Sequence, residues 1–217
     1  MLSGEVYSTI GGGQHSPPGV ADQGRELESM DSPSGVDIGD GGSLTMTKCT
    51  STGGTINVLE GASLVIEDCH VFDNNTGGSS NGVHCSGDVK ATRCTVEGNG
   101  ATGVYNYGAG ASGELVDCMI RQNGDGGVSV SRGKVVLRGS TSSENHMNGV
   151  NAHYAGKVTV AKAEEDGLLR TVCKDNERGN WGTEADGEII GIPQEKIHDE
   201  YSDDYLISTL LRPRFSC

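Results

Sequence analysis

Two aspartates, an arginine and a histidine are the residues whose types and spacing could support catalysis. Asp68, Arg93 and Asp117 recur at intervals of 25 and 24 residues, each directly before a cysteine, and His70 follows the first of those cysteines. Two carboxylates that flank a sugar linkage can hydrolyse it, and a histidine can act as a base or as a ligand. An arginine between the carboxylates, however, would keep both ionised, so that neither could act as an acid. We therefore expect a surface ladder of ion pairs, and these four residues form only the alternative, catalytic interpretation.

Aromatic residues form a second group of candidates. His84, Tyr105, Tyr107 and Tyr154 lie in or just after short segments that follow a glycine. Rings of this kind, next to Asn and Ser side chains, can stack on a sugar ring while the polar groups bind its hydroxyls. The same rings could instead do no more than shield the turns. A carbohydrate-binding surface made by these four residues is thus one of two interpretations of the pattern.

The elements that must position these residues are short strands in a repeat of 20 to 25 residues. Each repeat has two apolar residues separated by one position, then Cys-x-apolar, then Gly followed by apolar-x-apolar. Alternation places both apolar residues of a segment on one face of a strand. Because spacing and phase stay constant, equivalent strands must stack in parallel, about 4.8 Å apart. The sequence predicts an all-β parallel β-helix of about six or seven rungs over residues 35–192.

The two flanks lack this regular pattern. Residues 1–34 are rich in Gly, Pro, Ser and charge, which indicates an irregular N-terminal arm or a partial cap. The repeat weakens after Val160, where we expect the regular stack to end, and returns only faintly at 171–180 and 187–193. Residues 193–217 form a C-terminal cap or amphipathic tail in this interpretation. A capping helix with Ser202 as its N-cap would fit the apolar spacing there.

Two further columns are predicted to be structural. The cysteines should point inward as reduced thiols, because parallel Cα–Cβ vectors disfavour disulfides between neighbouring rungs and because seven is an odd number. The asparagines should form a ladder that satisfies the backbone of the turns. The four cysteines of the column are Cys49, Cys69, Cys94 and Cys118, and the four asparagines are Asn74, Asn99, Asn123 and Asn145.

The phrases LTMTKC, LVIEDC, VKATRC and ELVDC, each followed by a loop and a Gly-initiated strand, resemble the right-handed parallel β-helix repeat of the pectin-lyase-like superfamily. The resemblance covers roughly residues 35–163 and implies a right-handed coil. Because that superfamily includes polysaccharide lyases and glycoside hydrolases, it also implies a carbohydrate ligand. The Asp-Pro-His-Glu run of its epimerases and the repeated paired aspartates of its polygalacturonases are absent from this sequence.

Composition and charge narrow the classes of partner. The net charge is −14, which disfavours nucleic acid and anionic membranes. No apolar stretch is long enough to span a membrane, and the first residues lack the pattern of a signal peptide, so either the protein stays inside the cell or the recorded start is not the native one. The free cysteines favour a reducing compartment.

No metal or other cofactor is predicted. The GDGG segments at 39–42 and 124–127 would admit Ca²⁺ but lack the regular repeat of calcium-binding rolls. Two functions stay open. The first is a non-catalytic scaffold or binding module, with an oligo- or polysaccharide as its ligand. The alternative is a polysaccharide lyase or glycoside hydrolase that works in the groove outside the second and third strands.

Overall fold

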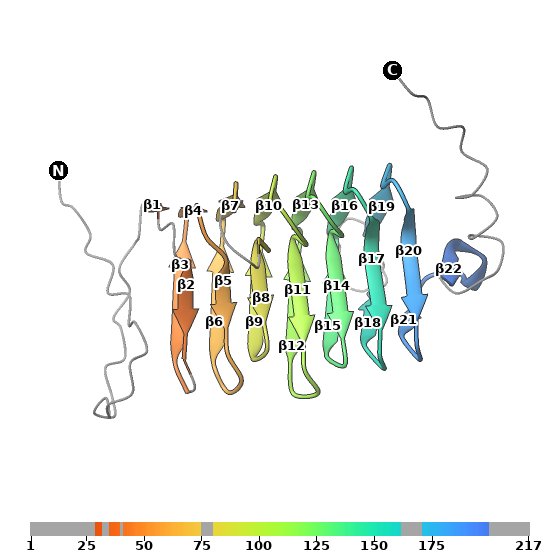
Figure 1. The fold of residues 1–217 in the computed structure, drawn as a ribbon, viewed down its shortest axis with the longest axis horizontal. Helices are drawn as coiled ribbons and strands as arrows, with labels where there is room; N and C mark the ends of the chain where they lie inside the picture. The colour runs from red at the N-terminus through yellow and green to blue at the C-terminus, as the bar shows by residue number, and fades with distance from the viewer. Residues whose placement is uncertain (1–28, 32–34, 40, 75–79, 162–170, 200–217) are drawn as a thin grey trace, which may run out of the picture.

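The computed structural model describes residues 29–31, 35–39, 41–74, 80–161 and 171–199 (Figure 1). Over these residues the chain winds through three sheets in turn, and every strand pairing is parallel. The predicted all-β parallel β-helix is confirmed. The described part of the chain contains no α-helix and no helix long and apolar enough to cross a membrane.

The three sheets run the length of the stack and contain seven, eight and seven strands. Sheet A comprises β1 (Ser29–Asp31), β4 (Thr50–Thr52), β7 (His70–Phe72), β10 (Thr95–Glu97), β13 (Met119–Arg121), β16 (Thr141–Ser143) and β19 (Val172–Lys174). Sheet B comprises β2 (Val36–Ile38), β5 (Ile56–Val58), β8 (Val83–Cys85), β11 (Val104–Tyr107), β14 (Val128–Ser131), β17 (Asn148–His153), β20 (Gly179–Glu184) and β22 (Ile197–Asp199). Sheet C comprises β3 (Ser43–Thr47), β6 (Ser63–Glu67), β9 (Asp88–Thr92), β12 (Ser112–Val116), β15 (Lys134–Arg138), β18 (Lys157–Val160) and β21 (Glu188–Ile190).

Alternation along each strand decides which side chains enter the core. In β6, Leu64 and Ile66 are buried, whereas Val65 between them is exposed. In-register pairing repeats this choice on every turn, since Leu64 lies beside Leu44 and Val89. The predicted inward residues are confirmed as buried: Leu64, Ile66, Cys69, Val71 and Val83.

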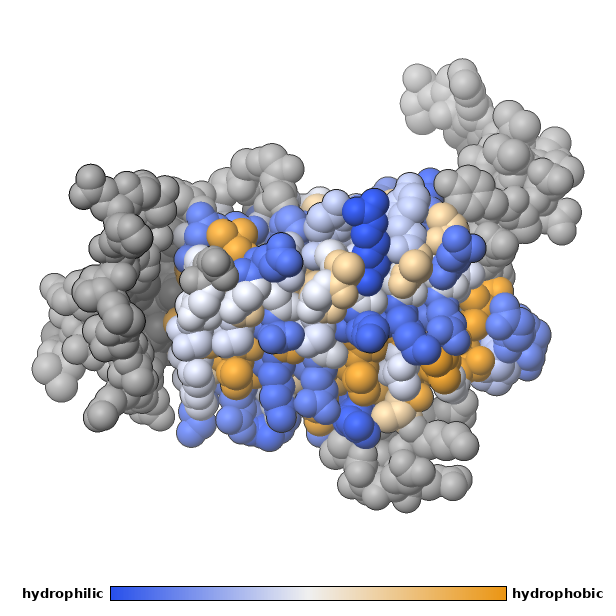
Figure 2. All heavy atoms as spheres, turned by 90° about the horizontal axis from the view of Figure 1, so that it is seen from below, coloured by the Kyte–Doolittle hydropathy of each residue, from blue (hydrophilic) through white to orange (hydrophobic). Residues whose placement is uncertain are grey.

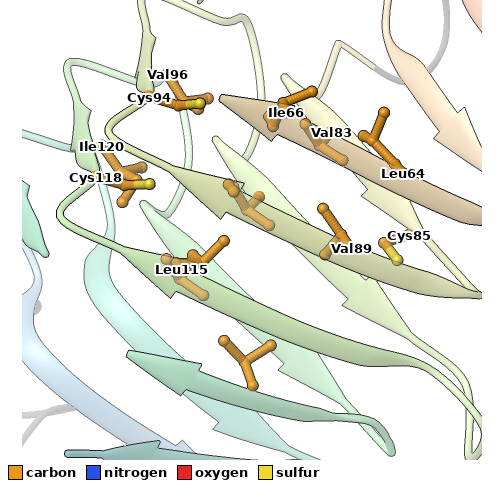
Figure 3. Close-up of a cluster of buried hydrophobic side chains, with 14 of the residues drawn as sticks. Leu64, Ile66, Val83, Cys85, Val89, Cys94, Val96, Leu115, Cys118 and Ile120 are labelled. Carbon is orange, nitrogen blue, oxygen red and sulfur yellow. The ribbon is translucent and has the colours of Figure 1, made fainter. Parts of the chain in front are cut away.

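The cysteine column lies inside the stack as predicted. Cys49, Cys69, Cys94 and Cys118 are buried, and none of the four forms a disulfide bond within the described part of the chain. Figure 3 shows Cys94 and Cys118 pointing into the interior from successive turns. The hydrogen bond to Cys118 is the main cause that raises the pKa of Cys94 to about 11, and burial raises the pKa of Cys85 to about 12. Cys94 and Cys85 therefore stay protonated near neutral pH, whereas the hydrogen bond with Cys94 lowers the pKa of Cys118. All three are buried and pack as small apolar side chains.

The asparagine ladder is also confirmed, and it is one residue longer than predicted. The Asn99 Nδ2 donates to Asn123 Oδ1 (2.9 Å), and the Asn123 Nδ2 donates to Asn145 Oδ1 (2.9 Å). The Asn145 Nδ2 continues to Asn176 Oδ1 (2.8 Å), and at the other end the Asn74 backbone N–H donates to Asn99 Oδ1 (3.3 Å). Side chains thereby satisfy the turns between sheets A and B, where the backbone leaves the strand ladder.

The C-terminal part of the stack differs from the sequence prediction. The stack does not end near Val160, because β19, β20 and β21 add another turn and β22 pairs with β20. After Pro193 the chain forms a single 3₁₀ turn, η1 (Gln194–Lys196), and not the start of an α-helix. The predicted capping helix with Ser202 lies outside the described residues. At the other end, β1 lies within the segment expected to be an irregular arm.

Candidate functional site

A groove of about 400 Å³ lies on the outer face of sheet B, over β11, β14, β17 and β20. Its floor follows the outward positions of these strands, where Tyr105, Ser129, Asn151 and Gly182 are neighbours in register. Because Ser129 is small, the face is hollowed between larger side chains such as Tyr105 and His153. The groove is lined by Asn81, Thr102, Tyr105, Asp125, Gly126, Ser129, Met147, Asn148, Asn151, His153, Tyr154 and Glu184.

Aromatic rings are grouped at this groove. Tyr105 lies 5.3 Å from His84, 5.9 Å from Tyr107 and 6.4 Å from His153, measured between ring centroids. His153 in turn lies 5.2 Å from Tyr154, whose side chain is among the exposed large ones. The structure thus brings the four predicted aromatic residues together on one face. Tyr105 and Tyr154 line the groove itself, while His84 and Tyr107 flank Tyr105.

Polar contacts fix the side chains of the groove. Ser129 Oγ and His153 Nε2 are hydrogen-bonded at 3.0 Å, which holds the imidazole over the floor. The Asn151 Nδ2 donates to Glu184 Oε1 at 3.4 Å, whereas Asn151 Oδ1 has no hydrogen-bond partner among the described residues. Burial raises the pKa of Tyr105, so its phenol stays neutral in the physiological range.

His84 and Tyr107 lie on the outward side of their strands, but neighbouring side chains cover them more than that position suggests. The His84 Nε2 is buried without a hydrogen-bond partner in the described structure, and burial lowers the pKa of this imidazole. Tyr107 remains 40 % exposed and carries the guanidinium of Arg132 at 5.8 Å from its ring centroid. His84 therefore supports the Tyr105 ring more than it presents a polar group to solvent.

The alternative catalytic residues lie elsewhere, at the corner between sheets C and A. Arg93 Nε contacts Asp68 Oδ1 at 2.7 Å, and its Nη2 contacts Glu67 Oε1 at 2.5 Å. The Arg93 guanidinium lowers the pKa of Asp68, as predicted for an ion pair. No ion pair joins Arg93 to Asp117 in the described residues, so the expected ladder does not extend to that rung.

Backbone conformation gives this corner a structural role that the sequence did not reveal. Asp68, Arg93 and Asp117 have φ values of 53°, 52° and 52°, in the left-handed region, and Gly139 occupies the next equivalent position with φ 58°. His70 is separate from them, because its Nε2 contacts Glu97 Oε1 at 2.8 Å and its ring stacks on Phe72. The four residues are therefore not assembled around a common hollow.

A second hollow, of about 430 Å³, lies on the outer face of sheet C and was not predicted. Two of its charged side chains pair with each other, since Glu114 contacts Lys90 at 3.5 Å, and Glu114 also contacts Arg138, outside the lining, at 3.3 Å. It contains no aromatic residue among those that line it. Viewed from below Figure 1, the stack carries hydrophilic side chains with separate apolar ones between them (Figure 2). We therefore regard the groove on sheet B as the candidate site.

Comparison with known proteins bears on the fold. A family model described as "Right handed beta helix region" matches residues 81–166, which include β11, β14 and β17 of the groove. The chain contains a right-handed β-helix region. The handedness implied by the sequence resemblance is thus supported. No curated protein and no solved structure matches the chain. Among the described residues, no cluster of three or more His, Cys, Asp or Glu side chains could hold a metal ion.

Proposed function

We propose that this right-handed β-helix is a non-catalytic module that binds an oligosaccharide on the outer face of sheet B. The observation that carries the proposal is the groove of about 400 Å³, in which two tyrosines stand beside hydroxyl, amide and carboxylate groups. Its volume is in the range of small-ligand sites. Its lining residues come from successive rungs of the stack, so successive sugar units can lie across successive rungs.

The groove supplies both kinds of contact that a sugar requires. The Tyr105 and Tyr154 rings offer flat apolar faces for the C–H face of a pyranose. Ser129, Asn151 and Glu184 offer groups that hydrogen-bond to its hydroxyls. The Ser129–His153 hydrogen bond holds part of this surface in place before a ligand arrives, which reduces the entropic cost of binding.

A matched set of aromatic variants tests the proposal. Binding to an oligosaccharide array would be measured for the natural protein and for Tyr105→Ala, Tyr105→Phe and Phe72→Ala. We expect Tyr105→Ala to weaken affinity about tenfold, because it removes the ring at the groove. Tyr105→Phe keeps the ring and should lose less. Phe72→Ala removes a ring from sheet A, outside the groove, and should leave affinity unchanged.

Product analysis distinguishes a module from an enzyme. The best-bound oligosaccharide would be incubated with the protein and examined for shorter or unsaturated products. Unchanged oligosaccharide supports the non-catalytic module. Cleavage that is lost in Ser129→Ala while binding persists would instead assign an enzymatic role to the groove. Absence of binding to any glycan on the array would overturn the proposal itself.

A further inference from the structure

The charge of the groove on sheet B has one sign. Asp125 and Glu184 contribute carboxylates to its lining, and no lysine or arginine is found among the described residues that line it. Arg132, a cation beside the ring cluster, lies over the Tyr107 ring at 5.8 Å from the centroid and is not among the lining residues. A ligand in the groove therefore meets negative charge that no lining residue with a fixed positive charge offsets.

The neutral polar groups of the groove add to this preference. Asn151 Oδ1 is buried and has no hydrogen-bond partner within the described ranges, while the Nδ2 of the same amide is directed to Glu184 Oε1. The amide thus turns its donor to the carboxylate and keeps an acceptor unused. Carboxylates are acceptors only, so Asp125 and Glu184 can receive hydrogen bonds from donor groups of a ligand. The polar side of the groove is suited to groups that donate hydrogen bonds.

We infer that the groove selects amino sugars, oligosaccharides that carry protonated amines, over neutral sugars and over uronates. The inference rests on the proposed carbohydrate-binding function and specifies its ligand class. An ammonium group donates to carboxylates and is attracted to the faces of aromatic rings such as Tyr105 and Tyr154. The net charge of −14 attracts such a ligand from a distance and repels a polyuronate.

Three tetrasaccharides with the same β-1,4-linked backbone isolate the contribution of the amine. They are the tetramers of glucosamine, N-acetylglucosamine and glucose, and a tetragalacturonate serves as the acidic counterpart. Affinities would be measured by calorimetry at about pH 6, where the amines are protonated and the carboxylates of Asp and Glu remain ionised. The glucosamine tetramer should bind at least about threefold more tightly than the glucose tetramer, and the galacturonate most weakly.

Charge-neutral variants connect that preference to particular side chains. Glu184→Gln and Asp125→Asn should each reduce the ratio of glucosamine to glucose affinity, and the double variant should bring the ratio close to one. Glu60→Gln removes the same charge from an exposed turn before β6, outside the groove, and should leave the ratio unchanged. Salt at about 1 M, which shortens the Debye length to roughly 3 Å, should also reduce the ratio.

The outcomes separate the two proposals. If none of the tetramers binds, the carbohydrate-binding function and the selectivity both fail. If the neutral tetramers bind as tightly as the glucosamine tetramer, with no effect of salt or of Glu184→Gln, the binding function stands and the selectivity is wrong. Tighter binding of the galacturonate than of the glucosamine tetramer would overturn the selectivity outright. If Glu60→Gln reduced the ratio of glucosamine to glucose affinity as much as Glu184→Gln does, the preference for the amine would be due to the net charge of the protein and not to the groove.

Discussion

Replacing Asn106 by valine should stabilise the protein. Asn106 points into the stack from β11 and is fully buried, between Cys85 and Val130 of the neighbouring rungs. Neither its Nδ2 nor its Oδ1 has a hydrogen-bond partner among the nitrogen and oxygen atoms of the described residues. Its polar neighbour is the thiol of Cys85, whose pKa is raised by burial and which makes only a weak side-chain hydrogen bond with the Asn106 amide. The equivalent inward positions carry apolar side chains on both adjacent rungs.

The expected gain in the free energy of unfolding follows from the cost of burying an amide that has no nitrogen or oxygen partner. Mutational data place that cost at about 1–3 kcal/mol, so Asn106→Val should raise the free energy of unfolding by about this amount. Valine has a similar size and the branched shape that strands favour. In a domain of this length, each kcal/mol corresponds to about 2–4 °C in Tm. The position is tight, since a Cβ added at Gly133 would lie 1.9 Å from the Asn106 Oδ1. A larger residue than valine should therefore lose the gain.

Urea unfolding followed by fluorescence of the single tryptophan, Trp181, measures the effect. The matched control is Asn123→Val, because Asn123 is equally buried but is hydrogen-bonded on both sides within the ladder. Breaking those bonds leaves the amides of Asn99 and Asn145 without these partners, so the control should lose about 2–4 kcal/mol. A urea midpoint for Asn106→Val that is lower than or equal to that of the natural protein would refute the idea that the two buried asparagines differ because only one has hydrogen-bonded amide atoms.

Three further outcomes follow from the structure. Asp117→Asn should change the free energy of unfolding by no more than about 1 kcal/mol, because asparagine accepts the positive φ of this position. Asp117→Val should lower it by about 1–2 kcal/mol or more, because a branched side chain does not. Equal effects of the two variants would contradict the left-handed backbone conformation at Asp117. Thiol reagents should leave Cys69, Cys94 and Cys118 unmodified until denaturant is added, and prompt modification in the native state would show that the column is accessible. Burial lowers the pKa of His84, so as the pH falls this histidine is protonated in the unfolded chain before it is protonated in the folded protein. The contribution of neutral His84 to the free energy of unfolding is therefore fully present above about pH 6.5 and decreases as the pH falls toward the pKa of the folded state. His84→Asn should flatten that part of the curve of unfolding free energy against pH, and a curve of unchanged slope would disprove the assignment.

Much of the fold could be predicted because the turns of a solenoid repeat the same residue types at a constant spacing. The alternation of Leu64, Val65 and Ile66, repeated at a constant interval, fixes both the inward face and the parallel stacking. The part beyond Val160 was predicted only as a faint continuation within 35–192, since Thr171 stands where earlier turns carry Cys or Ser, and Trp181 and Thr183 pair with the inward Val150 and Ala152. Pairing with β16 and β17 positions β19 and β20 despite their weak pattern.

The candidate site was predictable only in part. Alternation correctly placed Tyr105 on the outside of its strand, and the structure brings it beside Tyr154. Asp125 and Glu184 were missed, because Asp125 lies in a turn and Glu184 follows the weakened part of the repeat. The hollow also depends on the small side chain of Ser129, and a small residue at an outward position gives little signal in a sequence.

Mapping of an oligosaccharide on the protein by NMR tests the central claim most directly. Amide chemical shifts would be followed while the glucosamine or the glucose tetramer is added. We predict shift changes grouped on the outer face of sheet B, around Tyr105, Ser129, Asn151 and His153, with sheets A and C largely unaffected. Changes centred on the hollow of sheet C, around Lys90 and Glu114, would contradict it, as would binding that shifts only the corner at Asp68 and Arg93.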